Sequence, residues 1–345
     1  MPGISLKSTM NKIKIAVLIS REMREKCIGE PDFQRLQNLG EVVCSDRDKP
    51  SEQLITECMH GADACLTGWG TPPITPAMID QAPGLKLIAH SAGSVKAILA
   101  SIREQILQRN ILVASAVSSL GIGVAEFTLG MMLMTMKRAW RFNDLARHGQ
   151  WREKEEISRM KEPYQAVIGV VAASHVGRHL IKLLKNFDVR ILVYDPYLSA
   201  EDAGQLGAVK VPLDELFRSS DVVTIHAPST EETRHMIRAE YLRMMKNNAI
   251  LINTARGALI KEDDLIAELR TGRITACLDV TDPEPPAASS PLRTLPNVIL
   301  TPHIAGSVAN NCLRNGKFAV DDIENYFHNG NILHPVNIKL WDRLA

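Results

Sequence analysis

Short apolar runs rich in β-branched residues alternate with longer amphipathic stretches along nearly the whole chain. This alternation predicts parallel sheets covered by helices on both faces. In the first part of the chain the strand-like runs are 13–19, 41–44, 62–66, 85–89 and 111–114. In the second part they are 167–172, 191–194, 222–226, 249–253, 276–280 and 298–301. Six strands of this spacing match the size of a complete dinucleotide-binding sheet.

The periodicity changes between these two series of strands. From Gly123 to Arg147 apolar residues recur at helical spacing, which predicts a helix of about six turns. The polar stretch from Trp151 to Glu162 then leads to the second series. The apolar part of the helix, around Leu129 to Met136, is bounded by Glu126 and Lys137. It is shorter than a membrane span requires, so we expect a buried helix.

Length and composition narrow the class of protein. A chain of 345 residues favours two domains, at roughly 100–200 residues per domain. Apolar residues make up 45 % and charged residues 23 %, which excludes wholesale disorder. The net charge of +1 gives no reason to expect a nucleic-acid or membrane partner. Six scattered cysteines without a metal-like cluster, and an N-terminus unlike a signal peptide, predict a cytoplasmic protein with no bound metal.

The first strand–helix junction of the second series is where a dinucleotide-binding loop belongs. A GxGxxG motif there provides a tight turn, close approach of the pyrophosphate and close packing of the helix on the strand. In this register the three positions are Ala172, Ser174 and Gly177, so only the third glycine is present. The helix N-terminus still offers its free N–H groups to a pyrophosphate. The Ser174 hydroxyl either donates to that group or crowds it.

An acidic residue ends the next strand. Asp195 follows Gly177 by eighteen residues, where a ribose-binding acid belongs. A carboxylate there accepts hydrogen bonds from the ribose hydroxyls and repels a 2′-phosphate, which predicts NAD rather than NADP as the cofactor. The alternative is a turn residue that precedes Pro196.

Three motifs place reactive side chains directly after later strands. They are Asn253-Thr-Ala-Arg-Gly257, Leu278-Asp-Val-Thr-Asp-Pro-Glu-Pro285 and Leu300-Thr-Pro-His-Ile-Ala-Gly306. Open α/β sheets gather ligands at this edge. In this order the motifs resemble the D-isomer-specific 2-hydroxyacid dehydrogenase family, and the resemblance covers nearly the whole chain. The segment His90-Ser-Ala-Gly-Ser-Val-Lys96 and the serine at position 174 resemble one branch of that family, in which Ala172 would still be glycine.

The resemblance implies an α/β protein of two Rossmann-like, doubly wound parallel-sheet domains with a cleft between them. A substrate-binding, flavodoxin-like domain would comprise 1–122 plus 307–345. An NAD-binding Rossmann domain would comprise 123–306, including the dimerisation helices of a homodimer. The implied activity is that of an NAD-dependent D-2-hydroxyacid dehydrogenase (EC 1.1.1.-), which transfers a hydride between nicotinamide and a small D-2-hydroxy acid or its 2-keto form.

The resemblance also implies three catalytic residues. His303 would exchange a proton with the substrate oxygen, because imidazole can both give and take a proton near neutral pH. Glu284 would bind the other ring nitrogen and stabilise the imidazolium. Arg256 would bind the substrate carboxylate with its planar fork of donors. The alternatives are a turn histidine, a solvated loop acid and an arginine that holds a structural carboxylate.

The implied cofactor contacts lie at the carboxyl ends of the strands of the second series. Asp279 would accept a hydrogen bond from the nicotinamide carboxamide, with a strand-end cap as its alternative. The expected cofactor-binding residues are Ser174, His175, Val176, Gly177, Asp195, His226, Ala227, Pro228, Thr233, Thr254, Ala255, Asp279, His303, Ala305 and Gly306.

The implied substrate contacts lie mostly in the first series. The turn Ala92-Gly-Ser-Val95 would offer backbone N–H groups to a carboxylate. Lys96 stands where many relatives have Asp or Asn, and it is either a solvated lysine or a site for a second anionic group of the substrate. Trp69 either packs or covers the substrate side chain. The expected substrate-binding residues are Trp69, Ala92, Gly93, Ser94, Val95, Lys96 and Arg256.

A second class of function stays open from the sequence. The family includes transcriptional corepressors that keep the fold, and the missing glycines at Ala172 and Ser174 are what a decaying cofactor site would show. The chain would then be a catalytically silent NAD(H)-sensing regulatory protein. Arg256, Glu284 and His303 together favour the enzyme, because a sensor has little need of a proton donor and its partner.

Overall fold

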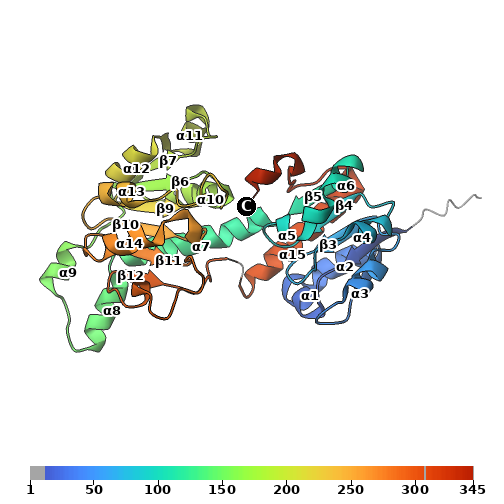
Figure 1. The fold of residues 1–345 in the computed structure, drawn as a ribbon, viewed down its shortest axis with the longest axis horizontal. Helices are drawn as coiled ribbons and strands as arrows, with labels where there is room; N and C mark the ends of the chain where they lie inside the picture. Colours follow the sequence, from blue (N-terminus) through green and yellow to red (C-terminus); the bar gives the residue numbers. More distant parts are fainter. Residues whose placement is uncertain (1–11, 307, 345) are drawn as a thin grey trace, which may run out of the picture. The chain divides into compact units, whose positions relative to one another are not determined.

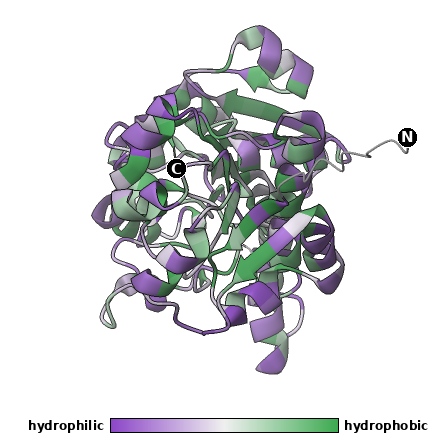
Figure 2. Ribbon diagram, turned by 90° about the vertical axis from the view of Figure 1, so that its right-hand side faces the viewer, coloured by the Kyte–Doolittle hydropathy of each residue, from purple (hydrophilic) through white to green (hydrophobic). Residues whose placement is uncertain are grey.

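The computed structural model describes residues 12–306 and 308–344, which form two compact units (Figure 1). Unit 1 contains the chain up to Ser119 and the segment Ala309–Leu344, and unit 2 contains Leu120–Val308. These divisions lie within three residues of the boundaries expected from the sequence. In Figure 2 the strands are mostly green, hydrophobic segments, and purple, hydrophilic stretches are prominent on the helices.

Unit 1 is built on a five-stranded parallel sheet of order β2-β1-β3-β4-β5. Its strands are β1 (Ile13–Val17), β2 (Gly40–Cys44), β3 (Ala64–Thr67), β4 (Leu87–His90) and β5 (Leu112–Ser115). One face is covered by α3 (Glu52–Met59), α4 (Pro76–Asp80), α5 (Lys96–Leu99) and α6 (Arg103–Gln108). The other face is covered by α1 (Arg21–Cys27), α2 (Glu30–Leu39) and α15 (Asn311–Asn329). This strand order is that of flavodoxin-like sheets.

Unit 2 is built on a seven-stranded parallel sheet of order β12-β11-β10-β9-β6-β7-β8. The strands are β6 (Ala166–Val171), β7 (Val189–Tyr194), β8 (Val209–Lys210), β9 (Val222–Ile225), β10 (Ile250–Asn253), β11 (Thr275–Leu278) and β12 (Val298–Leu300). The chain reverses its direction of winding between β6 and β9, which is the Rossmann arrangement and puts a ligand-binding crevice at the carboxyl ends of these strands. Sequence patterning missed β8, an exposed two-residue edge strand.

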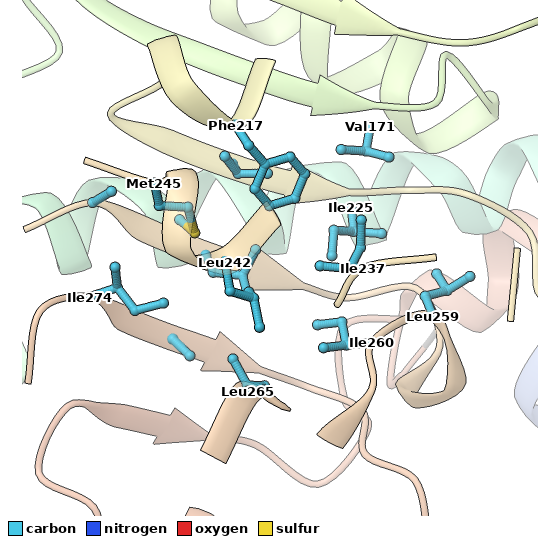
Figure 3. Close-up of a cluster of buried hydrophobic side chains, with 14 of the residues drawn as sticks. Val171, Phe217, Ile225, Ile237, Leu242, Met245, Leu259, Ile260, Leu265 and Ile274 are labelled. Atoms are coloured by element: carbon cyan, nitrogen blue, oxygen red, sulfur yellow. The ribbon is translucent and has the colours of Figure 1, made fainter. Parts of the chain in front are cut away.

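Two apolar layers sandwich this sheet. On one face α12 (Leu213–Ser219), α13 (Ala239–Met244) and α14 (Glu262–Leu269) bury Phe217, Leu242 and Leu265 against the strands (Figure 3). On the other face lie α10 (His175–Leu184), α11 (Ala200–Leu206) and most of α7 (Val117–Met136). The short helices α8 (Ala139–Arg147) and α9 (Lys154–Ser158) follow α7. Four 3₁₀ segments complete the elements: η1 (Ala100–Ile102), η2 (Gly257–Leu259), η3 (Pro291–Arg293) and η4 (Ile338–Arg343).

The helix expected over 123–147 differs from the one observed. It begins six residues earlier, at Val117, and ends at Met136, because Arg138 takes a left-handed conformation with φ 51° before α8 begins. By length and composition α7 is the one helix among the described residues that would suffice to cross a membrane. However, its Thr128 hydroxyl bonds to the Thr254 hydroxyl at 2.9 Å and its Thr135 hydroxyl to the Cys277 thiol at 3.1 Å. These bonds tie α7 to the sheet of unit 2 as a packed helix.

Candidate active site in unit 2 and the matching edge of unit 1

The loop after β6 keeps the shape of a glycine loop although its first glycine is replaced. Ala172 takes the left-handed φ of 73°, which glycine adopts freely and alanine adopts at a cost of about 1–2 kcal/mol. A Cβ atom on Gly177 would lie 2.2 Å from the Ala172 carbonyl oxygen, so only glycine fits there. The first helix turn therefore packs on the strand as closely as in a complete motif, and the turn is made with strain instead of with glycine.

Side chains hold this loop in place. The Ser174 hydroxyl is the N-cap of α10, accepting a hydrogen bond from the Gly177 N–H at 3.4 Å. Its hydrogen remains able to donate to a ligand. The Arg178 Nε–H donates to the Ala173 carbonyl at 2.9 Å. His175 is exposed at the start of α10 and Val176 is half-buried. The serine thus caps the helix, and Gly121 of α7 lies against the first turn of α10, where a Cβ atom would be 3.3 Å from the Val176 nitrogen.

Asp195 is part of the same construction. Its Oδ2 accepts a hydrogen bond from the Ala173 N–H at 2.9 Å, and its Oδ1 accepts one from the Tyr197 N–H at 2.8 Å. The carboxylate therefore joins the end of β7 to the glycine-loop position, as the spacing of the two motifs implied. Both of its oxygens still have a lone pair for a further donor.

The loop after β9 begins with a buried histidine. His226 Nε2 lies 2.9 Å from the Thr224 hydroxyl, while its Nδ1 is buried and has no hydrogen-bond partner among the described residues. Burial lowers the pKa of His226 to about 3, so the ring is neutral at physiological pH. Ala227 is buried, and the Pro228 carbonyl accepts a hydrogen bond from the Thr233 hydroxyl at 2.6 Å. A polar group of a bound ligand could give this nitrogen the hydrogen bond that it lacks.

The loop after β10 presents an arginine. The Asn253 side chain donates to the Arg256 carbonyl at 2.9 Å and accepts from the Ala255 N–H at 3.1 Å, which fixes the turn. The exposed Arg256 guanidinium donates to the Ala255 carbonyl at 2.7 Å. A Cβ atom on Gly257 would lie 2.0 Å from the Thr281 carbonyl carbon, so the loops after β10 and β11 touch through their backbones. The glycine of this motif therefore sets how closely the two loops approach.

Asp279 anchors the loop that carries the histidine. Its Oδ1 accepts hydrogen bonds from the Thr301 hydroxyl at 2.6 Å and the Ile304 N–H at 2.9 Å, and its Oδ2 accepts one from the Ala305 N–H at 2.9 Å. The carboxylate is buried. Asp279 thus caps the end of its strand, which was the alternative interpretation of this residue from the sequence. A contact between Asp279 and a nicotinamide stays a prediction.

His303 and Glu284 lie together at the carboxyl edge of the sheet. His303 Nδ1 is 2.5 Å from Glu284 Oε1, and both side chains are exposed. The His303 N–H donates to the Asp279 carbonyl at 2.9 Å, and the residue takes a left-handed φ of 54°. Because Nδ1 is engaged by the carboxylate, Nε2 is the ring nitrogen left to exchange a proton. The structure therefore brings together two of the three expected catalytic residues, with Arg256 on the next strand's loop.

The equivalent edge of unit 1 is made mostly of backbone. A Cβ atom on Gly68 would lie 2.4 Å from the Ser91 Oγ, so the loop that carries Trp69 abuts the turn after β4. The Ser115 hydroxyl contacts the carbonyls of Ala92 at 3.0 Å and Gly93 at 2.6 Å, which orients that turn. Within the described chain, no hydrogen bond from the N–H groups of Gly93 and Ser94 to the backbone or a side chain is found. These groups are therefore available to an anion.

Lys96 and Trp69 flank this turn in unit 1. Lys96 is the first residue of α5, is half-buried, and forms no ion pair with a described carboxylate. Trp69 is one of the exposed large apolar side chains of the protein. Behind the turn, His90 Nδ1 lies 2.9 Å from the Thr67 hydroxyl, and burial lowers the pKa of His90 to about 4.

Sequence reasoning missed the residues that hold the site. Asn253, Arg178 and Ser115 received no role, although all three fix loops through hydrogen bonds to carbonyl groups. Asn253 carried a signal, since an Asn that ends a strand before a turn commonly bonds to the backbone two or three residues on. For Arg178 and Ser115, neither the spacing nor the residue type predicts the hydrogen bond to a backbone carbonyl. Among the described residues no group of three or more His, Cys, Asp or Glu could hold a metal ion.

Comparison with known proteins agrees with this architecture. Residues 129–305 match the D-isomer specific 2-hydroxyacid dehydrogenase, NAD binding domain. The chain is 35 % identical to a D-3-phosphoglycerate dehydrogenase of Methanocaldococcus jannaschii over 298 residues, 85 % of this chain and 54 % of that protein. It is 32 % identical to a glyoxylate reductase of Korarchaeum cryptofilum, covering 86 % of this chain and 87 % of that protein.

A solved structure shows the same fold. A phosphoglycerate oxidoreductase from Rhizobium etli, 21 % identical, aligns with a TM-score of 0.81 over 94 % of this chain and 98 % of its own. The chain spans about half the length of the phosphoglycerate dehydrogenases that it matches. It spans most of the length of the matching glyoxylate reductase. The chain therefore belongs to the D-isomer-specific 2-hydroxyacid dehydrogenase family, and unit 2 contains its NAD-binding domain.

Proposed function

We propose that the protein is an NAD-dependent oxidoreductase that interconverts a small D-2-hydroxy acid and its 2-keto acid. The observation that carries the proposal is the His303–Glu284 pair at 2.5 Å, at the ligand-binding edge of an NAD-binding sheet, with Arg256 on the adjacent loop. Relatives named glyoxylate reductase and hydroxypyruvate reductase support the reaction class.

The residues of unit 2 fit a dinucleotide. The loop at Ala172 has the left-handed turn, Gly177 allows the close helix packing, and Asp195 lies at the end of β7, the second strand of unit 2. The pyrophosphate would lie at the N-terminus of α10, where the Ser174 hydroxyl can donate to it. The unsatisfied His226 Nδ1 supplies a further polar atom on the same edge. A bound nicotinamide would supply or accept the hydride.

The chain's own residues would manage the proton and the substrate charge. In reduction, His303 Nε2–H would donate its proton to the keto oxygen as that oxygen gains charge, and in oxidation the neutral ring would take the proton back. Glu284 would keep the ring oriented and stabilise the imidazolium form. Arg256 would pair with the substrate carboxylate through two parallel N–H donors. Asp279 would act as a positioning residue, since it holds the loop that carries His303.

In unit 1 we assign the turn at 92–95 to the substrate carboxylate and Lys96 to a second anionic group. The support is the unengaged N–H groups of Gly93 and Ser94 and the absence of an ion-pair partner for Lys96 among the described residues. Trp69 would cover the substrate side chain. A phosphate or a distal carboxylate is the chemistry that suits a lysine in this place.

We further propose a homodimer through the helices that follow the unit boundary. Met134 on α7 and Trp140 on α8 are exposed large apolar side chains that subunit association would remove from water. Light scattering on the purified protein would test this, and a monomer mass would contradict it. A cytoplasmic location would agree with the six free cysteines.

Oxidation of NADH, followed at 340 nm, tests the proposed reaction. The substrates are glyoxylate, hydroxypyruvate, pyruvate, 2-ketoglutarate and phosphohydroxypyruvate, with NADPH in parallel. We expect turnover with NADH and at least one of these acids. Binding of NADH without turnover on any of them would contradict the enzyme and favour the NAD(H)-sensing regulatory protein.

A further inference from the structure

A second carboxylate is linked to the Asp195 turn. The Tyr197 hydroxyl donates a hydrogen bond to Glu232 Oε2 at 3.4 Å, while the Tyr197 N–H donates to Asp195 Oδ1 at 2.8 Å. One tyrosine therefore connects the acid at the end of β7 with an acid in the loop after β9. These two loops flank the point where the winding of the sheet reverses, and the adenosine half of a dinucleotide binds there.

The loop that carries Glu232 is held by its own hydrogen bonds. The Thr233 hydroxyl donates to the Pro228 carbonyl at 2.6 Å and accepts from the Thr230 N–H at 2.8 Å. The Thr233 N–H donates to the Thr230 hydroxyl at 3.3 Å. Because this turn is closed on both sides of Glu232, the fold fixes the place of its backbone, and the Tyr197 hydroxyl lies within hydrogen-bond distance of its side chain.

The charge of Glu232 is less compensated than that of Asp195. Both oxygens of Asp195 accept a backbone N–H, and these dipoles offset part of its negative charge. From the described residues, Glu232 accepts one hydrogen bond, that of the Tyr197 hydroxyl. Among the described lysines and arginines, none forms an ion pair with Asp195, Glu231 or Glu232, and the nearby Arg234 pairs with Asp282 at 3.7 Å. Arg178 and Lys210 lie beside the Asp195 turn, bonded to the carbonyls of Ala173 and Leu198, and neither forms an ion pair with the two acids.

We propose that Glu232 is a second specificity-determining residue for the cofactor, which acts with Asp195 to exclude an adenosine 2′-phosphate. Tyr197 is its positioning residue. This inference rests on the proposed dinucleotide site at Asp195. The 2′-phosphate of NADP carries close to two negative charges, so a carboxylate held beside it weakens its binding through Coulomb repulsion that grows as the distance shortens, while NAD has no charge at that position.

The test compares the dissociation constants of NADH and NADPH for the full chain, measured by nucleotide fluorescence without substrate. We expect Glu232→Gln to tighten NADPH about 5-fold at low ionic strength and to change NADH by less than about 2-fold. The gain should shrink in 0.5 M salt because repulsion between exposed charges is screened. Glu231→Gln is the matched control, since it removes the same charge one residue away, where no bond to Tyr197 fixes it.

Tyr197→Phe separates position from charge. It keeps both carboxylates but frees Glu232, so we expect NADPH to tighten by about 2-fold, less than in Glu232→Gln. Equal changes for NADH and NADPH in Glu232→Gln, or the same gain in Glu231→Gln, would overturn the inference and leave the dinucleotide site intact. If the unaltered protein bound neither nucleotide, the dinucleotide site itself would fall, and this inference with it.

Discussion

The two sheets of this protein share one architecture and present different chemistry at the same edge. In unit 1 the carboxyl ends of the strands offer backbone N–H groups, oriented by the Ser115 hydroxyl. In unit 2 they offer titratable side chains, Glu284 on the loop after β11 and His303 on the loop after β12, which is anchored by Asp279. The sheet therefore sets the place at which a ligand can bind, and the residues of the loops set the chemistry available there.

One feature is common to both edges. Each unit buries a histidine near the carboxyl end of a strand and satisfies one ring nitrogen with a threonine hydroxyl, His90 with Thr67 and His226 with Thr224. Neither histidine is placed to titrate near neutrality, because burial lowers the pKa of both rings. The exposed His303 is different, since its partner is a carboxylate. Among these three histidines, burial separates those that support the fold from the one proposed to react.

The largest effect is expected at the reactive edge of unit 2. His303→Gln should lower kcat about 10²–10⁴-fold, because the proposed proton donor to the substrate oxygen is lost. The dissociation constant of NADH should stay within about 2-fold, since the helix N-terminus and Asp195 are unchanged. The exposed His148→Gln is the control and should keep full activity. A normal kcat in His303→Gln would contradict the catalytic assignment.

The next effect concerns the buried histidines. Below pH 6.5 the unfolded chain binds a proton at each imidazole while the folded chain does not, until the pH reaches the folded pKa values of about 4 for His90 and about 3 for His226. The folded state therefore loses stability as the pH falls through this window. Each histidine should cost about 2 kcal/mol by pH 5.

Denaturant unfolding at pH 7.5 and pH 5.0 measures this cost. His226→Gln and His90→Gln should each lose less stability over that interval than the unaltered protein, whatever their stability at pH 7.5. Equal losses in the variants and the unaltered protein would mean that neither ring is held neutral by burial.

A smaller effect is expected at the edge of unit 1. Lys96→Ala should raise the KM for doubly anionic substrates about 10-fold and change the KM for monoanionic ones little, because one charge–charge contact is lost. Lys49→Ala, an exposed lysine of the same unit, serves as control. Equal effects on both substrate classes would mean that Lys96 is a solvated lysine without a role in substrate binding.

The smallest effect should be a gain. Ala172→Gly relieves the left-handed conformation and should stabilise the protein by about 0.5–1 kcal/mol, after the larger entropy of glycine in the unfolded chain is subtracted. Ala267→Gly, at an exposed position inside α14, should destabilise the protein by about 1 kcal/mol. The same substitution would therefore have opposite effects on stability at the two positions. Denaturant unfolding measures both. Loss of stability in Ala172→Gly would show that the loop is not strained.

Apolar runs predicted the main strands to within about two residues, since a strand buried on both faces must be apolar throughout. The two-residue β8 is exposed and has no such pattern. The break after α7 could not be predicted either, because no glycine or proline marks Arg138, and packing of the helix on the sheet decides its ends. The motifs pointed to His303, Glu284 and Arg256 as candidates, whereas the hydrogen bonds that position their loops depend on backbones that approach each other only in the fold.

The anchoring of the histidine loop has a consequence for its exchange with solvent. The amide hydrogens of His303, Ile304 and Ala305 are all bonded to Asp279, one through its carbonyl and two through its carboxylate. Opening this segment requires a buried anion to lose its donors together, so these amides should exchange with deuterium as slowly as those of a strand. A segment without regular secondary structure would thus be among the slowly exchanging parts of unit 2, and its protection would report directly on the state of the loop that carries His303.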